Sequence, residues 1–142
     1  PFPSTSVDAL HSHNSFQRLS TQQVDFLLRD CYRVLKPGGA LFFSVPDAEP
    51  VLKAYCERRA HFDAHHGGVW QPGWHETGSC MDQVTYMAYC NGHVRSMFDR
   101  ENAVNLCVKA GFLGTELRPP DPRIDGDQRP PDTLYFVARK SA

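Results

Sequence analysis

The chain has 142 residues, 41% of them hydrophobic, and a formal net charge of -1. This length and apolar content predict one domain over residues 1–142, while the interspersed charges argue against a nucleic-acid partner. The longest apolar run, residues 40–46, is far shorter than the roughly 20 residues of a membrane span, and five cysteines without short paired spacings favour reduced thiols and a cytoplasmic location.

The first third of the chain predicts a strand, a helix and a second strand. Residues 7–13 alternate loosely in hydrophobicity, and the segment after Ser20 shows the three- and four-residue apolar spacing of a helix. This helix is expected to end at the sequence LKPGG, residues 35–39, because proline blocks propagation and glycine permits the turn. Residues 40–45 are continuously apolar, which is typical of a strand buried on both faces. The order predicts two parallel strands joined by a crossover helix.

The middle of the chain predicts one more helix and then a long irregular segment. Apolar residues at three- and four-residue intervals indicate a helix at residues 49–62. Residues 66–94 mix glycines and prolines with aromatic side chains, a composition too broken for one regular element. We therefore expect residues 66–94 to form an irregular lid or acceptor-site loop, since long ordered loops are usually functional.

The last third predicts a helix and a strand pair. The helix begins near Asp99, a good N-cap residue, and ends at Gly111. Residues 113–117 and 133–138 are candidate strands, and the proline-rich stretch between them reads as a long surface connection. The whole order predicts an α/β fold with parallel strands, a C-terminal antiparallel hairpin and flanking helices.

Several short motifs carry a resemblance to a known family. Residues 6–13 read SVDALHSH, residues 34–41 read VLKPGGAL and residues 44–47 read SVPD. Together with SMFD at 96–99 and AGF at 110–112, they resemble the C-terminal half of class I S-adenosylmethionine (SAM)-dependent methyltransferases of the small-molecule type, which have a Rossmann-like fold.

The resemblance implies that the predicted strands correspond to the fourth to seventh strands of the family's sheet. The glycine-rich turn and the acidic residue that hold the cofactor in the first half have no counterpart in this sequence. The resemblance therefore implies SAM as the cofactor only when such a half is supplied. The pair Gln17-Arg18 also departs from the Glu-His pair that is common in relatives after the fourth strand.

The carboxyl end of the first strand is the expected cofactor site, because open α/β sheets bind ligands at such strand ends. The resemblance implies that His11, Ser12, His13, Asn14 and Gln17 lie beside the cofactor. His11 and His13 are also candidate catalytic bases, since an unperturbed imidazole titrates near pH ~6.5. The alternative for each is a polar strand-end side chain that makes only local hydrogen bonds.

Aromatic side chains further along the chain form the expected acceptor site, because small-molecule pockets combine apolar walls with a few polar groups. The predicted acceptor-binding residues are Trp70, Trp74, His75, Tyr86 and Tyr89, and His93 is a third candidate catalytic residue. Packing of the two tryptophans beneath a long loop is the alternative.

The histidines also raise the question of a metal site. His61 and His65 are four residues apart, with Cys80 and Cys90 downstream, but the spacing matches no compact zinc signature. We therefore predict no metal.

Two functions fit the sequence. The leading one is SAM-dependent methyl transfer to a small-molecule, sugar or lipid acceptor, and the alternative is a non-catalytic binding or assembly module derived from the same fold. Without the neighbouring strand of the family, residues 7–13 would form an unpaired sheet edge, and such edges seek partners. We therefore expect a homo-oligomer formed through residues 7–13.

Overall fold

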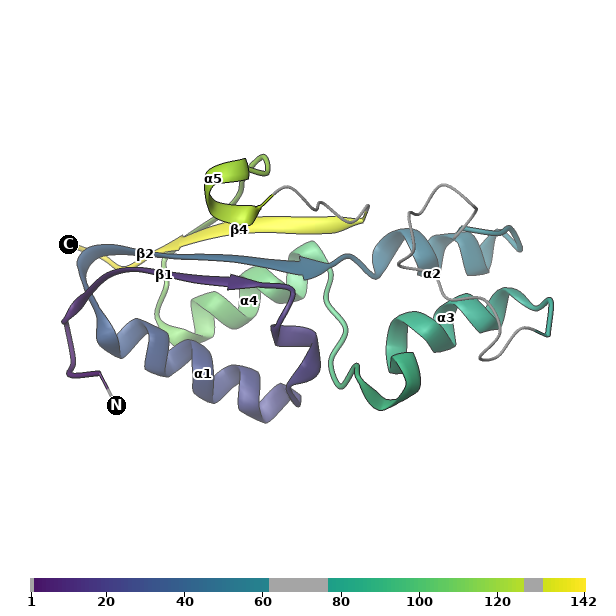
Figure 1. The fold of residues 1–142 in the computed structure, drawn as a ribbon, viewed down its shortest axis with the longest axis horizontal. Helices are drawn as coiled ribbons and strands as arrows, with labels where there is room; N and C mark the ends of the chain where they lie inside the picture. The colour runs from purple at the N-terminus through teal and green to yellow at the C-terminus, as the bar shows by residue number, and fades with distance from the viewer. Residues whose placement is uncertain (1, 62–76, 127–131) are drawn as a thin grey trace.

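The computed structural model describes residues 2–61, 77–126 and 132–142. The strands are β1 (Val7–His13), β2 (Leu35–Pro46), β3 (Gly114–Leu117) and β4 (Thr133–Arg139). The helices are α1 (Thr21–Val34), α2 (Glu49–Cys56), α3 (Cys80–Tyr89), α4 (Arg100–Ala110) and α5 (Pro122–Asp125), with single turns η1 (Phe16–Arg18) and η2 (Cys90–Gly92). The sheet has the order β1-β2-β4-β3, with α1 and α4 on one face and α5 on the other (Figure 1).

The parallel pair of strands forms as predicted. β1 and β2 run parallel, with Ala9 opposite Ala40 and His13 opposite Ser44. The connecting helix α1 begins at a capping box, in which the Ser20 hydroxyl accepts the Gln23 N–H and the Gln23 side chain accepts the Ser20 N–H. The strand–crossover helix–strand prediction is confirmed.

The LKPGG sequence belongs to the start of β2, which already begins at Leu35. Gly38 has a φ of +76°, the left-handed region that favours glycine. A Cβ on Gly39 would lie 2.9 Å from the carbonyl oxygens of both Asp8 and Lys36. Gly38 therefore permits the irregularity in β2 between Leu35 and Ala40, where the register with β1 shifts, and Gly39 lets β1 approach β2 closely.

The C-terminal hairpin is also confirmed. β4 lies antiparallel to both β2 and β3, with Phe136 opposite Phe43 on one side and Leu117 on the other. The helix before it, α4, starts at an Asp99 capping box and ends at Gly111, whose φ is +111°. Both ends of α4 are therefore determined locally, as predicted.

The core lies between the sheet and the helices α1 and α4. The Phe43 and Phe136 rings stack with centroids 4.9 Å apart, and both residues are at most 2% exposed. The same buried cluster contains Leu28 of α1 and Cys107 of α4. Within the run 40–45 of β2, every residue is buried except the half-buried Phe42. β2 is therefore covered on both faces, as its continuous apolar run predicts.

One predicted helix end is wrong, and two helices were not predicted. α2 ends at Cys56 and not at residue 62, because the chain turns at Arg58 with a φ of +55°. Part of the segment predicted to be irregular forms α3, since Ser79 starts a regular helix through a capping box with Asp82. The predicted surface connection contains α5, and its Asp125 is buried. Across the described ranges, no helix combines the length and apolar character needed to cross a bilayer.

Candidate functional site

The carboxyl ends of β1 and β2 lie side by side, and hydrogen bonds tie the turn after β1 to β2. Asn14, with a φ of +44°, makes the turn. Its N–H donates to both the carbonyl oxygen and the Oγ of Ser44, at 3.1 and 3.2 Å. Gln17 then closes the turn by donating from Nε2 to the Asn14 carbonyl oxygen at 2.7 Å. The two predicted cofactor-binding residues Asn14 and Gln17 are therefore brought together.

Two buried oxygens at this turn have no hydrogen-bond partner within the described ranges: Asn14 Oδ1 and Gln17 Oε1. Buried polar atoms in folded proteins are almost always bonded, so each such atom calls for an explanation. Both oxygens can only accept hydrogen bonds. They therefore suit a ligand that carries N–H groups.

A row of side chains crosses three strands next to this turn. Ser44 stands opposite His13 on one side and Tyr135 on the other. The His13 Nδ1 and Ser44 Oγ atoms are 2.9 Å apart, and the His13 and Tyr135 ring centroids are 6.5 Å apart. Ser44 is completely buried. His13 is thus held by a buried hydroxyl at the strand end.

His11 lies two residues before His13 on β1 and contacts a different partner. Its Nε2 is 3.6 Å from Oδ1 of Asp125, a residue of α5. Asp125 also accepts from both terminal nitrogens of Arg118, and these hydrogen bonds lower the pKa of Asp125 to about 2. His11 therefore joins the contact between α5 and the sheet, which favours the alternative of a structural strand residue.

Ser12 is separated from the histidines by the alternation of the strand. Side chains of successive strand residues point to opposite faces, so the Ser12 side chain lies on the face opposite His11 and His13. The predicted group of five cofactor residues is thus brought together only in part.

The segment after α3 comes back to the same turn. The N–H groups of Arg95 and Ser96 donate to the Gln17 carbonyl oxygen at 2.7 and 3.2 Å. This contact brings the end of η2, and the exposed His93 that follows it, toward the carboxyl end of β1.

The predicted acceptor residues divide into two groups. Tyr86 is half-buried on α3, and its burial and the nearby Cys90 raise the pKa of Tyr86 to about 12. Tyr89 is 53% exposed at the end of α3. Three further predicted residues lie outside the described ranges: Trp70, Trp74 and His75.

Two carboxylates lie near the end of β2: Asp47 directly follows β2, and Asp132 directly precedes β4 and accepts the Asp47 N–H on its backbone oxygen at 2.7 Å. The Asp47 side chain accepts the Glu49 N–H at 3.0 Å, as a cap of α2 would, and burial raises the pKa of Asp47. The Asp132 side chain pairs with His61 Nε2 at 2.5 Å. In the parts of the chain that the structure describes, no group of three or more His, Cys, Asp or Glu side chains is placed to hold a metal ion.

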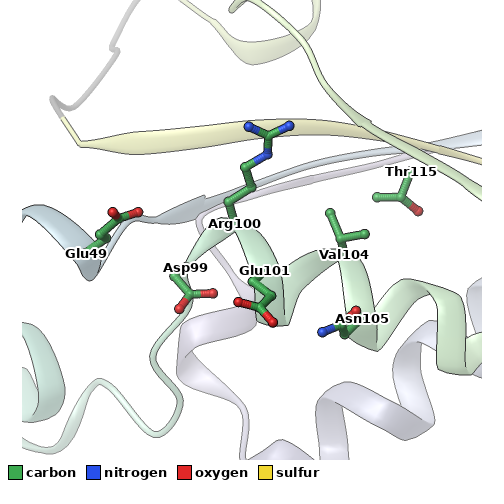
Figure 2. Close-up of a pocket in the computed structure, with 7 residues that line it drawn as sticks. All are labelled: Glu49, Asp99, Arg100, Glu101, Val104, Asn105 and Thr115. Atoms are coloured by element: carbon green, nitrogen blue, oxygen red, sulfur yellow. The ribbon is translucent and has the colours of Figure 1, made fainter.

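An open pocket of about 670 Å³ lies where the starts of α2 and α4 face β3 (Figure 2). It is lined by Glu49, Asp99, Arg100, Glu101, Val104, Asn105 and Thr115. Figure 2 shows the Arg100 side chain extending toward β4, away from the carboxylates of Asp99 and Glu101. None of the predicted site residues lines this pocket, and five of its seven lining residues come from residues 99–105, at the start of α4.

Sequence reasoning also missed Ser44, Tyr135 and the Arg118–Asp125 pair. Ser44 had a signal, since it is the only polar residue in the apolar run 40–45. Arg118 and Asp125 had none, because their contact depends on how the proline-rich connection folds back over the sheet.

Comparison with known proteins agrees with this architecture. A methyltransferase-domain family model matches residues 1–43. The ubiquinone/menaquinone biosynthesis C-methyltransferase UbiE of Escherichia coli O1:K1 / APEC is 31% identical over 115 residues, which are 79% of this chain and 41% of that protein. The chain thus spans about two fifths of the length of this curated relative.

Two solved structures show the same fold. Phosphoethanolamine N-methyltransferase 2 of Haemonchus contortus, in complex with SAM, superposes with a TM-score of 0.59 and 15% identity, over 100% of this chain and 35% of that one. A SAM-dependent methyltransferase of Mesorhizobium loti gives 0.56 and 20%, over 98% of this chain and 64% of that one. The parallel pair β1–β2 and the β3–β4 hairpin match the fold of these two structures, and the sequence matches show that the chain belongs to the class I SAM-dependent methyltransferase family, whose cofactor is S-adenosyl-L-methionine.

Proposed function

We propose that this chain forms the acceptor-side half of a methyltransferase that transfers the methyl group of SAM to a small-molecule, sugar or lipid acceptor. The observation that carries the proposal is the pair of buried, unpartnered oxygens Asn14 Oδ1 and Gln17 Oε1 at the carboxyl end of β1. This turn lies within residues 1–43, which match the methyltransferase family model.

The chemistry of these residues suits SAM. When bound, SAM supplies an electrophilic methyl group on a sulfonium and also carries an ammonium group. Buried carbonyl oxygens favour an ammonium, because hydrogen bonds that involve a charged group are stronger than neutral ones. Methyl transfer then needs mainly in-line positioning and the exclusion of water, so few side chains need to act chemically. Asn14 and Gln17 would orient the ligand, and His13, the last residue of β1, would also contact it.

The acceptor would lie toward α3. The hydrogen bonds from Arg95 and Ser96 to Gln17 support this placement, because they bring the α3–η2 segment beside the cofactor turn. Tyr86, Tyr89 and His93 of that segment would contact the acceptor. Trp70, Trp74 and His75 are proposed to complete the same site.

Full affinity for SAM would require a glycine-rich half, which this sequence does not contain. The test is calorimetric titration with SAM of the chain alone and of the chain joined to the glycine-rich half of a class I methyltransferase. The joined protein should bind SAM at least about a hundredfold more tightly, with the chain alone in the millimolar range. No binding by a folded joined protein would overturn the proposal and favour the non-catalytic module.

We also propose that the chain self-associates through β1. Within the described ranges β1 pairs only with β2, and its residues Asp8 and Ala9 are exposed. Sedimentation velocity over a dilution series should show a dimer that Ala9→Lys converts to monomer, because charged side chains block edge pairing. A monomer at all concentrations would exclude this assembly.

A cytoplasmic location is the remaining part of the proposal. The five cysteines support it, since all of them are free thiols.

A further inference from the structure

We infer that Ser44 is a positioning residue that fixes His13 in the tautomer with its proton on Nε2, so that His13 offers the ligand a hydrogen-bond donor and not a general base. The nature of the ligand rests on the proposed function. The tautomer itself is a property of the chain without ligand and can be tested separately.

The argument begins with the Ser44 hydroxyl, which is completely buried. Two groups of the described chain lie within hydrogen-bond distance of its oxygen: the Asn14 backbone nitrogen at 3.2 Å and His13 Nδ1 at 2.9 Å. The Asn14 N–H can only donate, so the hydroxyl oxygen accepts from it. The Asn14 N–H is shared with the Ser44 carbonyl oxygen at 3.1 Å, and this second contact holds the turn against the strand end.

The hydroxyl proton then needs an acceptor. Within the described ranges, Nδ1 of His13 is the acceptor in reach. If Nδ1 carried the proton and donated to Ser44, the buried hydroxyl proton would have no acceptor there. Buried polar groups in native proteins are rarely left unpaired. The arrangement that satisfies every group has Ser44 donating to Nδ1.

The tautomer decides what His13 can do. In a neutral imidazole one nitrogen carries the proton and the other accepts a hydrogen bond. With Nδ1 occupied by Ser44 and Nε2 protonated, neutral His13 has no free lone pair with which to remove a proton from an acceptor. Its Nε2–H meets no partner in the described part of the chain, so it is available to an acceptor oxygen of the ligand. With Asn14 Oδ1 and Gln17 Oε1, the strand end then presents one donor and two acceptors.

The test is NMR spectroscopy of the 142-residue chain with ¹⁵N-labelled histidine rings, without ligand, at about pH 8.5, where a free imidazole is neutral. Long-range ¹H–¹⁵N correlations distinguish the two tautomers, and the signals of His13 are those that disappear in His13→Gln. We expect His13 to be a single species protonated on Nε2. Ser44→Ala should convert this single species into a mixture of tautomers.

Two further variants keep the result specific. Ser15→Ala removes a hydroxyl that bonds the backbone oxygen of His13 at 2.9 Å and not its ring, so the tautomer should stay unchanged. Ser44→Cys keeps the shape with a weaker donor and should give an intermediate mixture, which also covers the case in which Ser44→Ala does not fold. A proton on Nδ1 in the unsubstituted chain, or a tautomer that Ser44→Ala leaves unchanged, would overturn the inference. Neither result would depend on whether SAM binds.

Discussion

The carboxylate of Asp125 accepts hydrogen bonds from both terminal guanidinium nitrogens of Arg118, at 2.6 and 2.7 Å. This pair lies with α5 over the face of the sheet opposite the main core (Figure 1). The side chains of Arg118 and Asp125 are only 12% and 0% exposed. The Arg118 guanidinium also lies 5.5 Å from the centroid of the Phe42 ring. This pair therefore holds α5 onto the sheet from within a largely buried position.

Removing one partner of this pair should be costly. Arg118→Met leaves the Asp125 charge buried without its main partner, so the free energy of unfolding should fall by about 3–5 kcal/mol in urea denaturation. The double variant Arg118→Met/Asp125→Leu should recover most of the loss, because no buried charge remains. Arg123→Met is the matched control, because Arg123 pairs with Asp121, the N-cap of the same helix, and its side chain is 88% exposed. Its loss should change the free energy of unfolding far less than the loss of Arg118. Equal losses from Arg118→Met and Arg123→Met would contradict this account.

The same carboxylate should make the stability depend on pH. Arg118 lowers the pKa of Asp125 from 3.8 to about 2, so Asp125 binds a proton less readily in the folded chain than in the unfolded one. Its contribution is therefore present above about pH 4 and is lost as the pH falls toward 2. Unfolding measured from pH 5 to pH ~2 should show the advantage of the unsubstituted chain over Asp125→Asn shrinking through this window. A difference that stays constant, or that grows on acidification, would show that the pair does not set this dependence.

Gly39 and Gly114 offer a matched pair of substitutions in the sheet. A Cβ at Gly39 would meet two backbone oxygens at 2.9 Å, whereas a Cβ at Gly114 would meet nothing within 4 Å. Gly39→Ala should lower the free energy of unfolding by about 1–3 kcal/mol, and Gly114→Ala should be neutral or slightly stabilising. Thermal unfolding followed by circular dichroism would measure both, and a tolerated Gly39→Ala would mean that β1 does not need this close approach.

Gln17 should matter for the ligand more than for the fold. In the joined protein, Gln17→Met removes one of the two buried acceptor oxygens, together with the Nε2 donor that closes the turn, and should weaken SAM binding by about 10- to 100-fold, the loss expected for a hydrogen bond to a charged group. Gln22→Met makes the same chemical change on the exposed face of α1 and should leave the dissociation constant unchanged. Calorimetric titration of both variants gives the comparison. Equal affinities for the two would remove Gln17 from the site.

The sequence predicted the elements whose signals are local. Ser20, Asp99 and Gly111 mark helix ends by their own chemistry, and the apolar run 40–45 marks the buried strand, so β1, β2, α1, α4 and the hairpin were placed correctly. α3 was missed because a glycine- and proline-rich stretch precedes it and masks its short helical pattern.

The site was predicted in part for the same reason. Asn14 and Gln17 come just after the end of β1 in the sequence, so their positions in the chain were enough to predict that they lie together. His11 and His13 share a face of β1, with ring centroids 6.5 Å apart, but they have different partners. The sequence could not predict this difference, because the contact of His11 depends on Asp125, which is more than a hundred residues away. Ser44 could have been singled out by its polarity, but its partner is set by the strand register.

The most direct test of the proposed cofactor site is a ¹H–¹⁵N NMR titration of the chain with S-adenosylhomocysteine, the demethylated form of SAM, up to millimolar concentration. Our account predicts weak binding, with shift changes concentrated at residues 13–17 and at residues 44–47, where β1 and β2 end side by side. Shift changes confined to the pocket around Asp99 and Asn105, or none at all, would contradict it, because the carboxyl ends of β1 and β2 would then not hold the cofactor.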